Sequence, residues 1–349
     1  MSLNLINPFM KFASGGGGGV PFWEELDRVT VGSATDTIDT GTFTAKENIM
    51  LLYHILKTGD ARVDALRFNA DSTSSYARRI SDNGGSDSTN VNQTGIEDTT
   101  SSSGEEFTAA YVSNNADWEK LGVSSCINQN SAGASVPRSL ENYYKWANTS
   151  SQINQVSLTN NQSGSFAAGS EIVVLGFDNT GSGSSAWELL DSTTASGSTT
   201  NLTSGTFDPK KYLLIQAYGV ADSTIDDTGW QFGTGGSLDT GNNYARRFNF
   251  NNGSQDASSG QVYIRFAQGA TAGGEIFCQA FVINSSAQEK MAITQVSRNY
   301  NSGANNEPSW FESFGKWSNT SGQINIVNLR NSLSNNYTSD SWIKVWGFD

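Results

Sequence analysis

The sequence predicts an all-β protein with two tandem antiparallel β-sandwich domains of jelly-roll type and an extended N-terminal arm. Three observations carry this prediction. The 349-residue chain is 16% charged and 11% aromatic, and it is rich in Gly, Ser, Thr and Asn, a composition typical of β-proteins with polar loops. Its apolar residues fall in short runs bounded by turn formers. Its two halves carry matching blocks in the same order.

The internal repeat is clearest in KWANTSSQI at residues 145–153, which recurs as KWSNTSGQI at residues 316–324. The separation of matching residues grows from 164 between Trp23 and Trp187 to 171 at the nine-residue stretch. Further matching blocks are YARR at 76–79 and 244–247, FTAAYV at 107–112 and FCQAFV at 277–282, and EIVVLGFD at 171–178 and WIKVWGFD at 342–349. This pattern indicates a duplicated domain whose loops have drifted in length.

The repeat divides the chain into four parts. They are an arm with its glycine linker at 1–20, a first sandwich at 21–178, a short polar linker at 179–185 and a second sandwich at 186–349.

Within each domain the apolar runs have the length and composition of strands. Runs rich in β-branched and aromatic residues favour buried strands, and alternating runs such as QVYIRFAQG at 261–269 favour strands with two distinct faces. In chain order, the expected strands include 49–56, 152–160, 170–178, 211–220 and 261–269. Loops are expected at 81–90 and 234–243, which are full of turn formers. Only SLENYYKWAN at 139–148 favours a short turn of helix.

Charge and composition argue against several classes of function. The net charge of −13 and the lack of a basic patch argue against nucleic-acid binding. No apolar run approaches 18 residues, so no membrane span is expected. Cys126 and Cys278 are not at matching positions, which predicts two free thiols that act as small apolar residues. The single histidine, His54, is expected to be a half-buried strand residue.

No arrangement of catalytic residues stands out, so the prediction is a protein that is not an enzyme and needs no cofactor. Two weaker alternatives stay open. Acidic side chains in DNGGSD at 82–87 and DSTIDDTG at 222–229 are close enough in sequence for a calcium loop, although the EF-hand spacing is missing. A pair of carboxylates for glycoside hydrolysis is also conceivable among 34 acidic residues, but no pair is singled out.

The repeated Trp and Arg residues have a structural and a functional interpretation. The two Trp of the nine-residue stretch are either core anchors or a platform for sugar, and the structural role is favoured because both copies keep the same neighbours. The YARR arginines form either internal ion pairs, with Glu24 or Glu188 as suggested partners, or a grip on a ligand carboxylate. The full repeated set is Trp23, Arg78, Arg79, Lys145, Trp146, Trp187, Arg246, Arg247, Lys316 and Trp317.

The N-terminal arm has no counterpart in the second half of the chain. Five glycines, Gly15 to Gly19, separate its apolar residues from the first domain. An exposed apolar decapeptide is an aggregation hazard, so it is expected to dock on a partner or neighbouring subunit, with packing on its own domain as the alternative. The candidate docking residues are Leu3, Leu5, Ile6, Phe9, Met10 and Phe12.

The repeated blocks FWEEL, YARR, KWANTSSQI and GSEIVVLGFD resemble repeat modules in virion structural proteins of marine tailed phages and related environmental viruses. The resemblance covers both domains but not the arm, and it carries over no catalytic residues. It implies a structural protein that is located in the virion, and it does not distinguish head, neck and tail. Taken together, the duplication, the arm and the resemblance predict a capsid decoration, head-fibre or tail-associated protein that assembles through its arm. The expected partners are other copies of the chain or other virion proteins, with host surface glycans as a further partner.

Two other functions stay open. One is a double jelly-roll major capsid protein, whose size and tandem β architecture fit. The other is a carbohydrate-binding surface protein or a strand-exchanged filament subunit. The carbohydrate-binding alternative predicts exposed aromatic residues beside Asn and Asp in the same loop of both domains.

Overall fold

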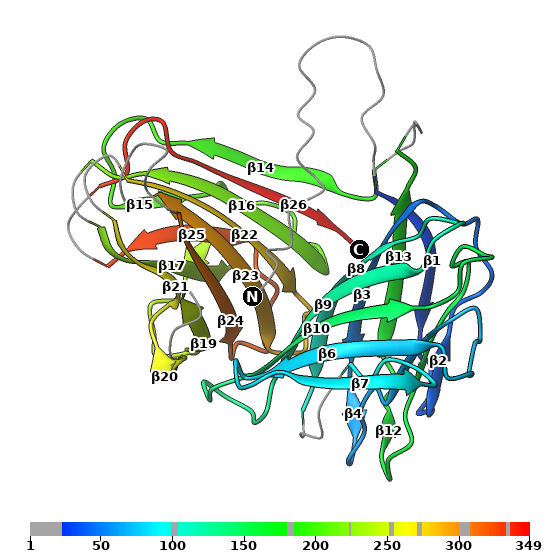
Figure 1. Cartoon of the computed structure of the whole chain (residues 1–349). Helices are drawn as coiled ribbons and strands as arrows, with labels where there is room; N and C mark the ends of the chain where they lie inside the picture. Colours follow the sequence, from blue (N-terminus) through cyan, green and yellow to red (C-terminus); the bar gives the residue numbers. More distant parts are fainter. Residues whose placement is uncertain are drawn as a thin grey trace. The chain divides into compact units, whose positions relative to one another are not determined.

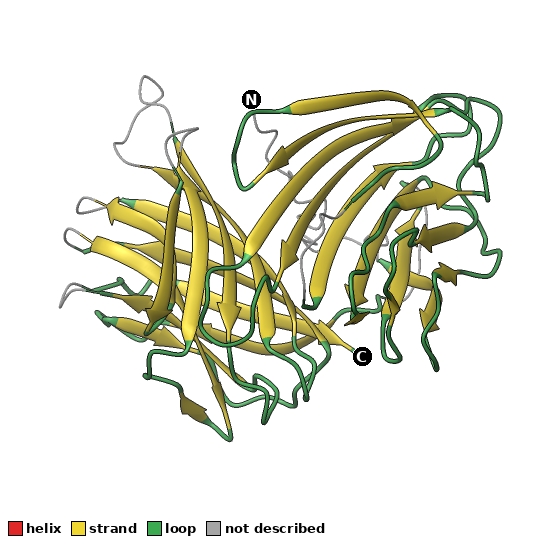
Figure 2. Cartoon of the chain, turned by 90° about the horizontal axis from the view of Figure 1, so that it is seen from below, coloured by secondary structure: helices red, strands yellow, loops and turns green. Residues whose placement is uncertain are grey.

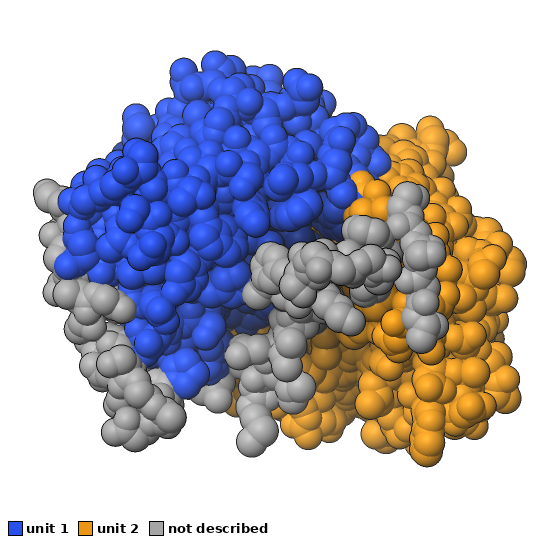
Figure 3. Space-filling view, turned by 90° about the horizontal axis from the view of Figure 1, so that it is seen from above, with its two compact units in different colours: residues 1–4, 131–138, 187–349 blue, residues 5–130, 139–186 orange. Residues whose placement is uncertain are grey.

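The computed structural model describes residues 23–98, 104–179, 185–222, 225–250, 255–270, 274–299, 308–332 and 336–349. Across these ranges the chain contains strands and loops and no helix (Figure 2). The prediction of an all-β fold with tandem antiparallel sandwiches is confirmed. Two compact units can be distinguished (Figure 3). Unit 2 contains the first half of the chain up to Ala186, except for residues 131–138, and unit 1 contains residues 131–138 and 187–349.

Unit 2 is built on one large antiparallel sheet and two small ones (Figure 1). In spatial order, the large sheet consists of β1 (Glu24–Thr30), β13 (Glu171–Phe177), β3 (Asn48–Ile55), β8 (Glu106–Ser113), β9 (Lys120–Asn128), β10 (Arg138–Trp146), β6 (Tyr76–Asp82) and β7 (Ser88–Gln93). The small sheets consist of β2 (Thr37–Asp39), β11 (Val156–Thr159) and β5 (Ala65–Phe68), and of β12 (Ser165–Phe166) and β4 (Lys57–Thr58).

Unit 1 repeats this architecture. Its large sheet consists, in spatial order, of β14 (Glu188–Thr194), β26 (Trp342–Phe348), β16 (Tyr212–Val220), β22 (Glu275–Ile283), β23 (Lys290–Asn299), β24 (Ser309–Trp317), β19 (Tyr244–Phe250) and β20 (Asp256–Gln261). Its small sheet consists of β15 (Asn201–Thr203), β25 (Ile326–Asn331), β17 (Ile225–Thr234) and β18 (Ser237–Leu238), with β21 (Ile264–Ala270) paired to β17.

The two large sheets have the same strand order, position by position, which shows the duplication in three dimensions. Even their irregularities recur. The register of β1 against β13 shifts between Glu25 and Asp27, and that of β14 against β26 shifts between Leu189 and Asp191. A β-bulge bends its strand and raises the local twist, so its recurrence indicates that the two sheets share the same local geometry as well as the same topology.

In each unit the core lies between the large and the small sheet, and strand alternation places it there. In β3 of unit 2, Ile49, Leu51, Tyr53 and Ile55 belong to the core cluster, because side chains two residues apart point to the same face. In β11 of the opposing small sheet, Leu158 joins the same cluster. Burial of these aliphatic and aromatic side chains is the main favourable term in the stability of such a sandwich.

Two local expectations are wrong. Residues 139–148 form most of strand β10 instead of a turn of helix, because Leu140, Tyr144 and Trp146 alternate onto the buried face of the sheet. His54 is fully buried, not half-buried, since the face of β3 opposite the core is covered as well.

The segment 131–138 also differs from expectation. It belongs to the sequence range expected for the first domain, yet the division into units places it in unit 1.

Candidate functional site

The Trp residues of the repeated nine-residue stretch are core residues in both units. Trp146 and Trp317 expose 1% and 0% of their surface. Each indole Nε1 donates a hydrogen bond to an aspartate Oδ2, that of Asp71 in unit 2 and that of Asp239 in unit 1, and both distances are 2.7 Å. The rings therefore have no free face for a sugar, and this geometry agrees with the structural interpretation.

The residues that follow each Trp form the same turn in both units. The Asn148 and Asn319 side chains each accept a hydrogen bond from the backbone N–H two residues later, at 2.8 Å. Their backbone carbonyls each accept a hydrogen bond from a buried ammonium group, that of Lys120 or Lys290, at 2.9 Å. These two lysines were not among the predicted residues, although Glu-Lys recurs in the sequence at 119–120 and 289–290.

A second pair of asparagines fixes the end of the stretch. Asn114 Oδ1 accepts a hydrogen bond from the Ile153 N–H at 2.6 Å, and its Nδ2 donates to the Ile153 carbonyl at 3.1 Å. Asn284 makes the same two bonds with Ile324 at the same distances. The repeated nine residues are thus one strand-and-turn element, used once per unit, in which the Asn side chain of the turn binds the protein's own backbone.

The tyrosines of the two YARR blocks also have matching roles. The Tyr76 hydroxyl accepts a hydrogen bond from the Phe68 N–H, and the Tyr244 hydroxyl accepts one from the Phe232 N–H, both at 3.0 Å. Each tyrosine ring stacks on the Trp of its unit, with interplanar angles of 15° and 14°.

The first arginine of each YARR block points inward and forms an ion pair. Arg78 pairs with Glu97 at 2.5 Å, and Arg246, which is buried, pairs with Asp256 at 2.7 Å. Of the second arginines, Arg79 is exposed and pairs with Asp87 at 3.1 Å.

Arg247 lies in unit 1. It donates hydrogen bonds to the Gln255 side chain at 2.9 Å and to the Pro137 carbonyl at 3.1 Å.

The suggested ion-pair partners of these arginines are wrong. Glu24 pairs with Lys46 at 2.5 Å, and Glu188 pairs with Lys210 at 2.7 Å. Both acids lie in the first strand of their large sheet, whereas YARR lies on the seventh strand in spatial order. The sheet topology separates the two motifs, which the linear sequence does not reveal.

Trp23 and Trp187 are buried at the edge of their large sheets. Trp23 packs edge-on against Phe177 with ring centroids 4.7 Å apart, and Trp187 packs against Phe348 at 4.6 Å. The Phe of each Gly-Phe-Asp ending is therefore the partner of the Trp that starts the same domain, which ties the two ends of each repeat together.

The lysines of the nine-residue stretch differ between the units. Lys145 pairs with Glu119 at the surface, at 2.9 Å. The matching pair in unit 1, Lys316 and Glu289, lies 3.1 Å apart and is buried. There Lys316 also donates to the Ser131 carbonyl, so residues 131–138 cover the pair within unit 1.

The residues with potential reactivity are buried. The imidazole of His54 lies 2.9 Å from the Glu105 carboxylate, with both groups inaccessible. Cys126 and Cys278 are free and buried, and burial raises the pKa of both thiols. Within the ranges that the structure describes, no group of three or more His, Cys, Asp or Glu side chains is arranged to hold a metal ion.

Unit 2 contains a buried polar cluster that is missing at the aligned positions of unit 1. The Asp98 carboxylate accepts hydrogen bonds from Tyr53, Ser124 and Asn142 and is fully buried. Burial raises the pKa of Asp98 to about 7, although the hydrogen bonds from Ser124 and Asn142 lower it. The negative charge of Glu106 adds to the rise.

Next to this carboxylate, Lys57 and Glu106 form an ion pair at 2.8 Å with side chains 1% and 0% exposed. The aligned positions in unit 1 are apolar: Ala221 matches Lys57 and Ile276 matches Glu106. The strand pairings agree with this alignment. Lys57 lies opposite Phe166 in unit 2, and Ala221 lies opposite Tyr337, the residue aligned with Phe166, in unit 1.

The raised pKa of Asp98 predicts a pH dependence of stability. The folded protein holds this proton more tightly than the unfolded chain, whose carboxyl has a pKa of 3.8. The free energy of unfolding should therefore fall by roughly 3–4 kcal/mol as the pH rises from about 4 to 7, and the loss should be complete by about pH 8. Asp98→Asn keeps a neutral side chain and should remove this fall, as measured by urea unfolding at several pH values. Parallel pH profiles for the parent and the variant would contradict the assignment.

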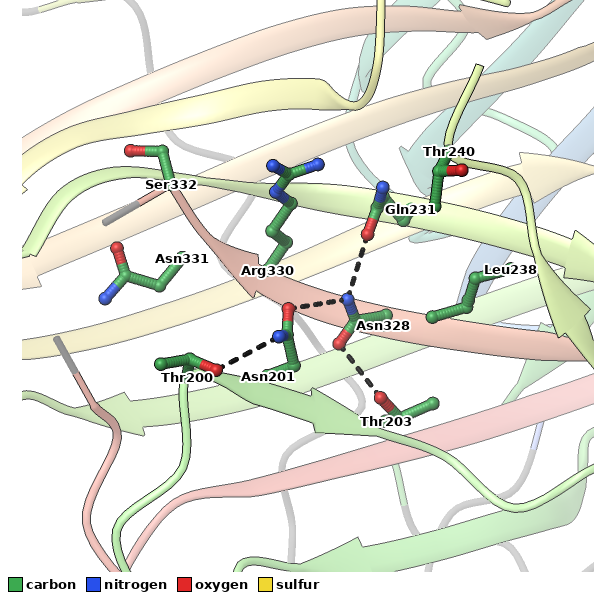
Figure 4. A pocket seen from close by; sticks show the side chains of 10 residues that line it. All are labelled: Thr200, Asn201, Thr203, Gln231, Leu238, Thr240, Asn328, Arg330, Asn331 and Ser332. Atoms are coloured by element: carbon green, nitrogen blue, oxygen red, sulfur yellow. Dashed lines mark hydrogen bonds between the residues drawn. The ribbon is translucent and has the colours of Figure 1, made fainter. Parts of the chain in front are cut away.

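A polar groove lies on the outer face of the small sheet of unit 1, with a volume of about 650 Å³ (Figure 4). Alternation creates it: in β25, Val327 and Leu329 point into the core, so Asn328 and Arg330 point outward. Strand β17 contributes Gln231, and strand β15 contributes side chains on the other side of β25.

The floor of the groove is a network of side-chain amides. Asn328 Nδ2 donates to Asn201 Oδ1 at 3.0 Å and to Gln231 Oε1 at 3.1 Å. Asn328 Oδ1 accepts from the Thr203 hydroxyl at 3.1 Å. Asn328 and Gln231 are buried, at 1% and 4% exposure. No sequence pattern marks this site, because its residues are ordinary polar residues from three separate strands.

The remaining candidates lie elsewhere. All six docking residues of the arm lie outside the described residues. Trp118 is 69% exposed and lies beside Asn115 and Asp117, as the carbohydrate-binding alternative expects for one domain. Its aligned residue in unit 1 is Gln288, so this loop does not present an aromatic residue in both domains.

In the described ranges no helix is long and apolar enough to cross a membrane.

Comparisons with known proteins supply no family. No protein-family model and no curated protein matches the chain. Among solved structures, the N-terminal domain of Pseudomonas aeruginosa OprF is 7% identical, with 82% of this chain and 98% of that chain covered and a TM-score of 0.14. Neisserial surface protein A is 6% identical, with 82% and 99% covered and a TM-score of 0.14. An acyl-CoA hydrolase from Agrobacterium tumefaciens is 7% identical, with 80% and 100% covered and a TM-score of 0.16. TM-scores this low carry no argument about fold or function.

Proposed function

We propose that this chain is a virion structural protein, such as a capsid decoration, head-fibre or tail-associated component, that acts by assembly and not by catalysis. One observation carries the proposal. Asparagine, lysine and tryptophan side chains at matching positions make the same internal hydrogen bonds in both units, as at Asn114 and Asn284, Lys120 and Lys290, and Trp146 and Trp317. The residues that the duplication repeats therefore form a structural framework and not a reactive site. The resemblance of the repeated blocks to phage virion modules supports the location.

The N-terminal arm is the proposed anchor. Its six apolar side chains at residues 3–12 are suited to a groove or a sheet edge on another subunit or another virion protein. Burying even one such side chain on a partner contributes about 1.5–3 kcal/mol, which corresponds to a tenfold or larger change in affinity.

Deletion of residues 1–14 tests this role. The truncated protein should keep its far-UV circular dichroism and thermal midpoint but lose self-association in mass photometry, or lose binding to purified virions by tenfold or more. A full-length variant with serine at the six apolar positions should behave like the deletion, which separates the chemistry of the arm from its length. Unchanged assembly and virion binding in both variants would refute the arm as anchor.

The same measurements separate the alternatives. A strand-exchanged filament subunit should form open-ended oligomers of the intact chain alone, and these should disappear on deletion of the arm. A major capsid protein should form closed shells or regular capsomers. A decoration or fibre protein should bind assembled particles without forming either structure.

A further inference from the structure

The groove of unit 1 carries a positive charge without a carboxylate partner in the described part of the chain. Arg330 is partly exposed, and its guanidinium lies over the ring of Tyr263, 5.0 Å from the centroid. No carboxylate of a described residue lies within ion-pair distance of it. The nearby Arg265, in contrast, pairs with Asp227 at 3.1 Å.

The backbone is shaped to hold Arg330 in this position. Gly229 lies opposite Arg330 in the register of β17 and β25. A Cβ at Gly229 would approach the Tyr263 ring to 2.4 Å, so only glycine leaves room for the ring beneath the guanidinium. Stacking on an aromatic face orients the planar guanidinium while leaving its N–H donors free for a ligand.

The rest of the groove is preorganised for hydroxyl groups. Asn328 is held by three hydrogen bonds to Asn201, Gln231 and Thr203, so the amide floor keeps its shape without a ligand (Figure 4). The network also holds Asn201 and Thr203, which line the groove, so a ligand that binds these two side chains loses little side-chain entropy. The volume of about 650 Å³ lies within the range of about 300–1,000 Å³ that small-ligand sites occupy.

The groove is also where the two copies differ. The aligned positions in unit 2 are Ser157 for Asn328 and Thr159 for Arg330, on the equivalent strand β11. The framework residues beneath keep their type, since Leu158 and Leu329 are both core residues. The aligned position of Gln231 in unit 2 is Arg67, so the amide pair of Asn328 and Gln231 is specific to unit 1.

We propose that this groove binds an acidic saccharide, with the ring hydroxyls on the amide floor and the carboxylate on Arg330. A lining of amides and hydroxyls around one cation matches a polyhydroxylated ligand that carries one negative charge. An apolar ligand is disfavoured, because binding sites for such ligands are mostly lined by apolar and aromatic side chains. Nucleic acid is disfavoured, because its phosphates require several cations.

The test uses the full chain and two matched pairs of probes, 3′-sialyllactose against lactose and digalacturonic acid against galactobiose, with dissociation constants from ligand-observed NMR. At least one acidic probe should bind, and should bind more tightly than its neutral partner. Arg330→Gln should weaken its binding roughly 10- to 100-fold and remove the preference over the neutral sugar, because a charge-assisted bond is lost. Asn201→Ala should weaken acidic and neutral probes alike.

Two control variants remove an arginine or an aromatic residue elsewhere. Arg79→Gln removes an exposed arginine of unit 2 and Trp118→Ala removes the exposed indole, and neither should change binding. Raising the ionic strength from about 0.01 to 1 M should reduce the preference for the acidic probe. The proposal is overturned if neither acidic probe binds, if Arg330→Gln binds like the parent while remaining folded, or if Trp118→Ala abolishes binding. These outcomes are independent of virion assembly, which the arm deletion measures.

Discussion

Replacing Glu106 by isoleucine alone, or Lys57 by methionine alone, is expected to lower the free energy of unfolding by about 3–5 kcal/mol, because each change leaves the other charge buried without its partner. The pair is 2.8 Å apart, and the two side chains are essentially inaccessible. Among the described residues, neither group has a hydrogen bond to another side chain that would compensate the loss.

The double variant Lys57→Met/Glu106→Ile should recover most of this loss. Unit 1 supplies the reason, since it builds the same architecture with Ala221 and Ile276 at these positions. Urea unfolding of the parent, both single variants and the double variant gives the coupling energy, which should be about 2 kcal/mol or more. The account holds that Lys57 and Glu106 are a buried ion pair that apolar side chains can replace. Two results would contradict it: additive effects of the two single variants, or single variants that are as stable as the parent.

The second large effect concerns the repeated Trp residues. Trp146→Ala and Trp317→Ala should each lower the free energy of unfolding by about 3–5 kcal/mol, the usual cost of removing a fully buried large aromatic side chain. Similar losses in both units are expected, because both indoles are buried and bind an aspartate at 2.7 Å. Trp118→Ala is the matched control, and it should stay within about 0.5 kcal/mol of the parent because its ring is 69% exposed.

Trp146→Phe separates the hydrogen bond from the packing. Although burial raises the pKa of Asp71, hydrogen bonds from Ser75, Thr73 and Trp146 outweigh this effect and hold the pKa at about 2. The stability that Asp71 contributes is therefore present above the unfolded pKa of 3.8 and is lost as the pH falls toward 2.

The phenylalanine variant lacks one donor, so its Asp71 should titrate at a higher pH than in the parent. The carboxyl ¹³C shift of Asp71 measures this directly. An unshifted titration would mean that the indole does not stabilise the carboxylate.

The fold could be predicted from the sequence because its signals are local and occur twice. Alternation of apolar residues marks strand β21, although this strand begins at Ile264 and not at the expected Gln261. The second copy confirms each block against chance. The helical turn expected at 139–148 was wrong, because Leu, Glu and Lys favour helix locally while the burial of Tyr144 and Trp146 in the sheet decides the outcome.

The contacts of the repeated residues were harder to predict. An ion pair for Arg78 could be expected from composition, but its partner Glu97 depends on how strands and loops meet in space. The buried cluster at Asp98 and the groove at Arg330 were missed for a related reason. They lie where the two copies differ, whereas an internal repeat is visible in the sequence only at positions where the copies agree.

The central claim is that the chain is a structural part of a virus particle. The most direct test is quantitative mass spectrometry of virus particles from the source of this sequence, purified on a density gradient. The account predicts that peptides of the chain sediment with the particles, at a fixed copy number relative to the major capsid protein across the gradient. Peptides that are found only in fractions free of particles would contradict it.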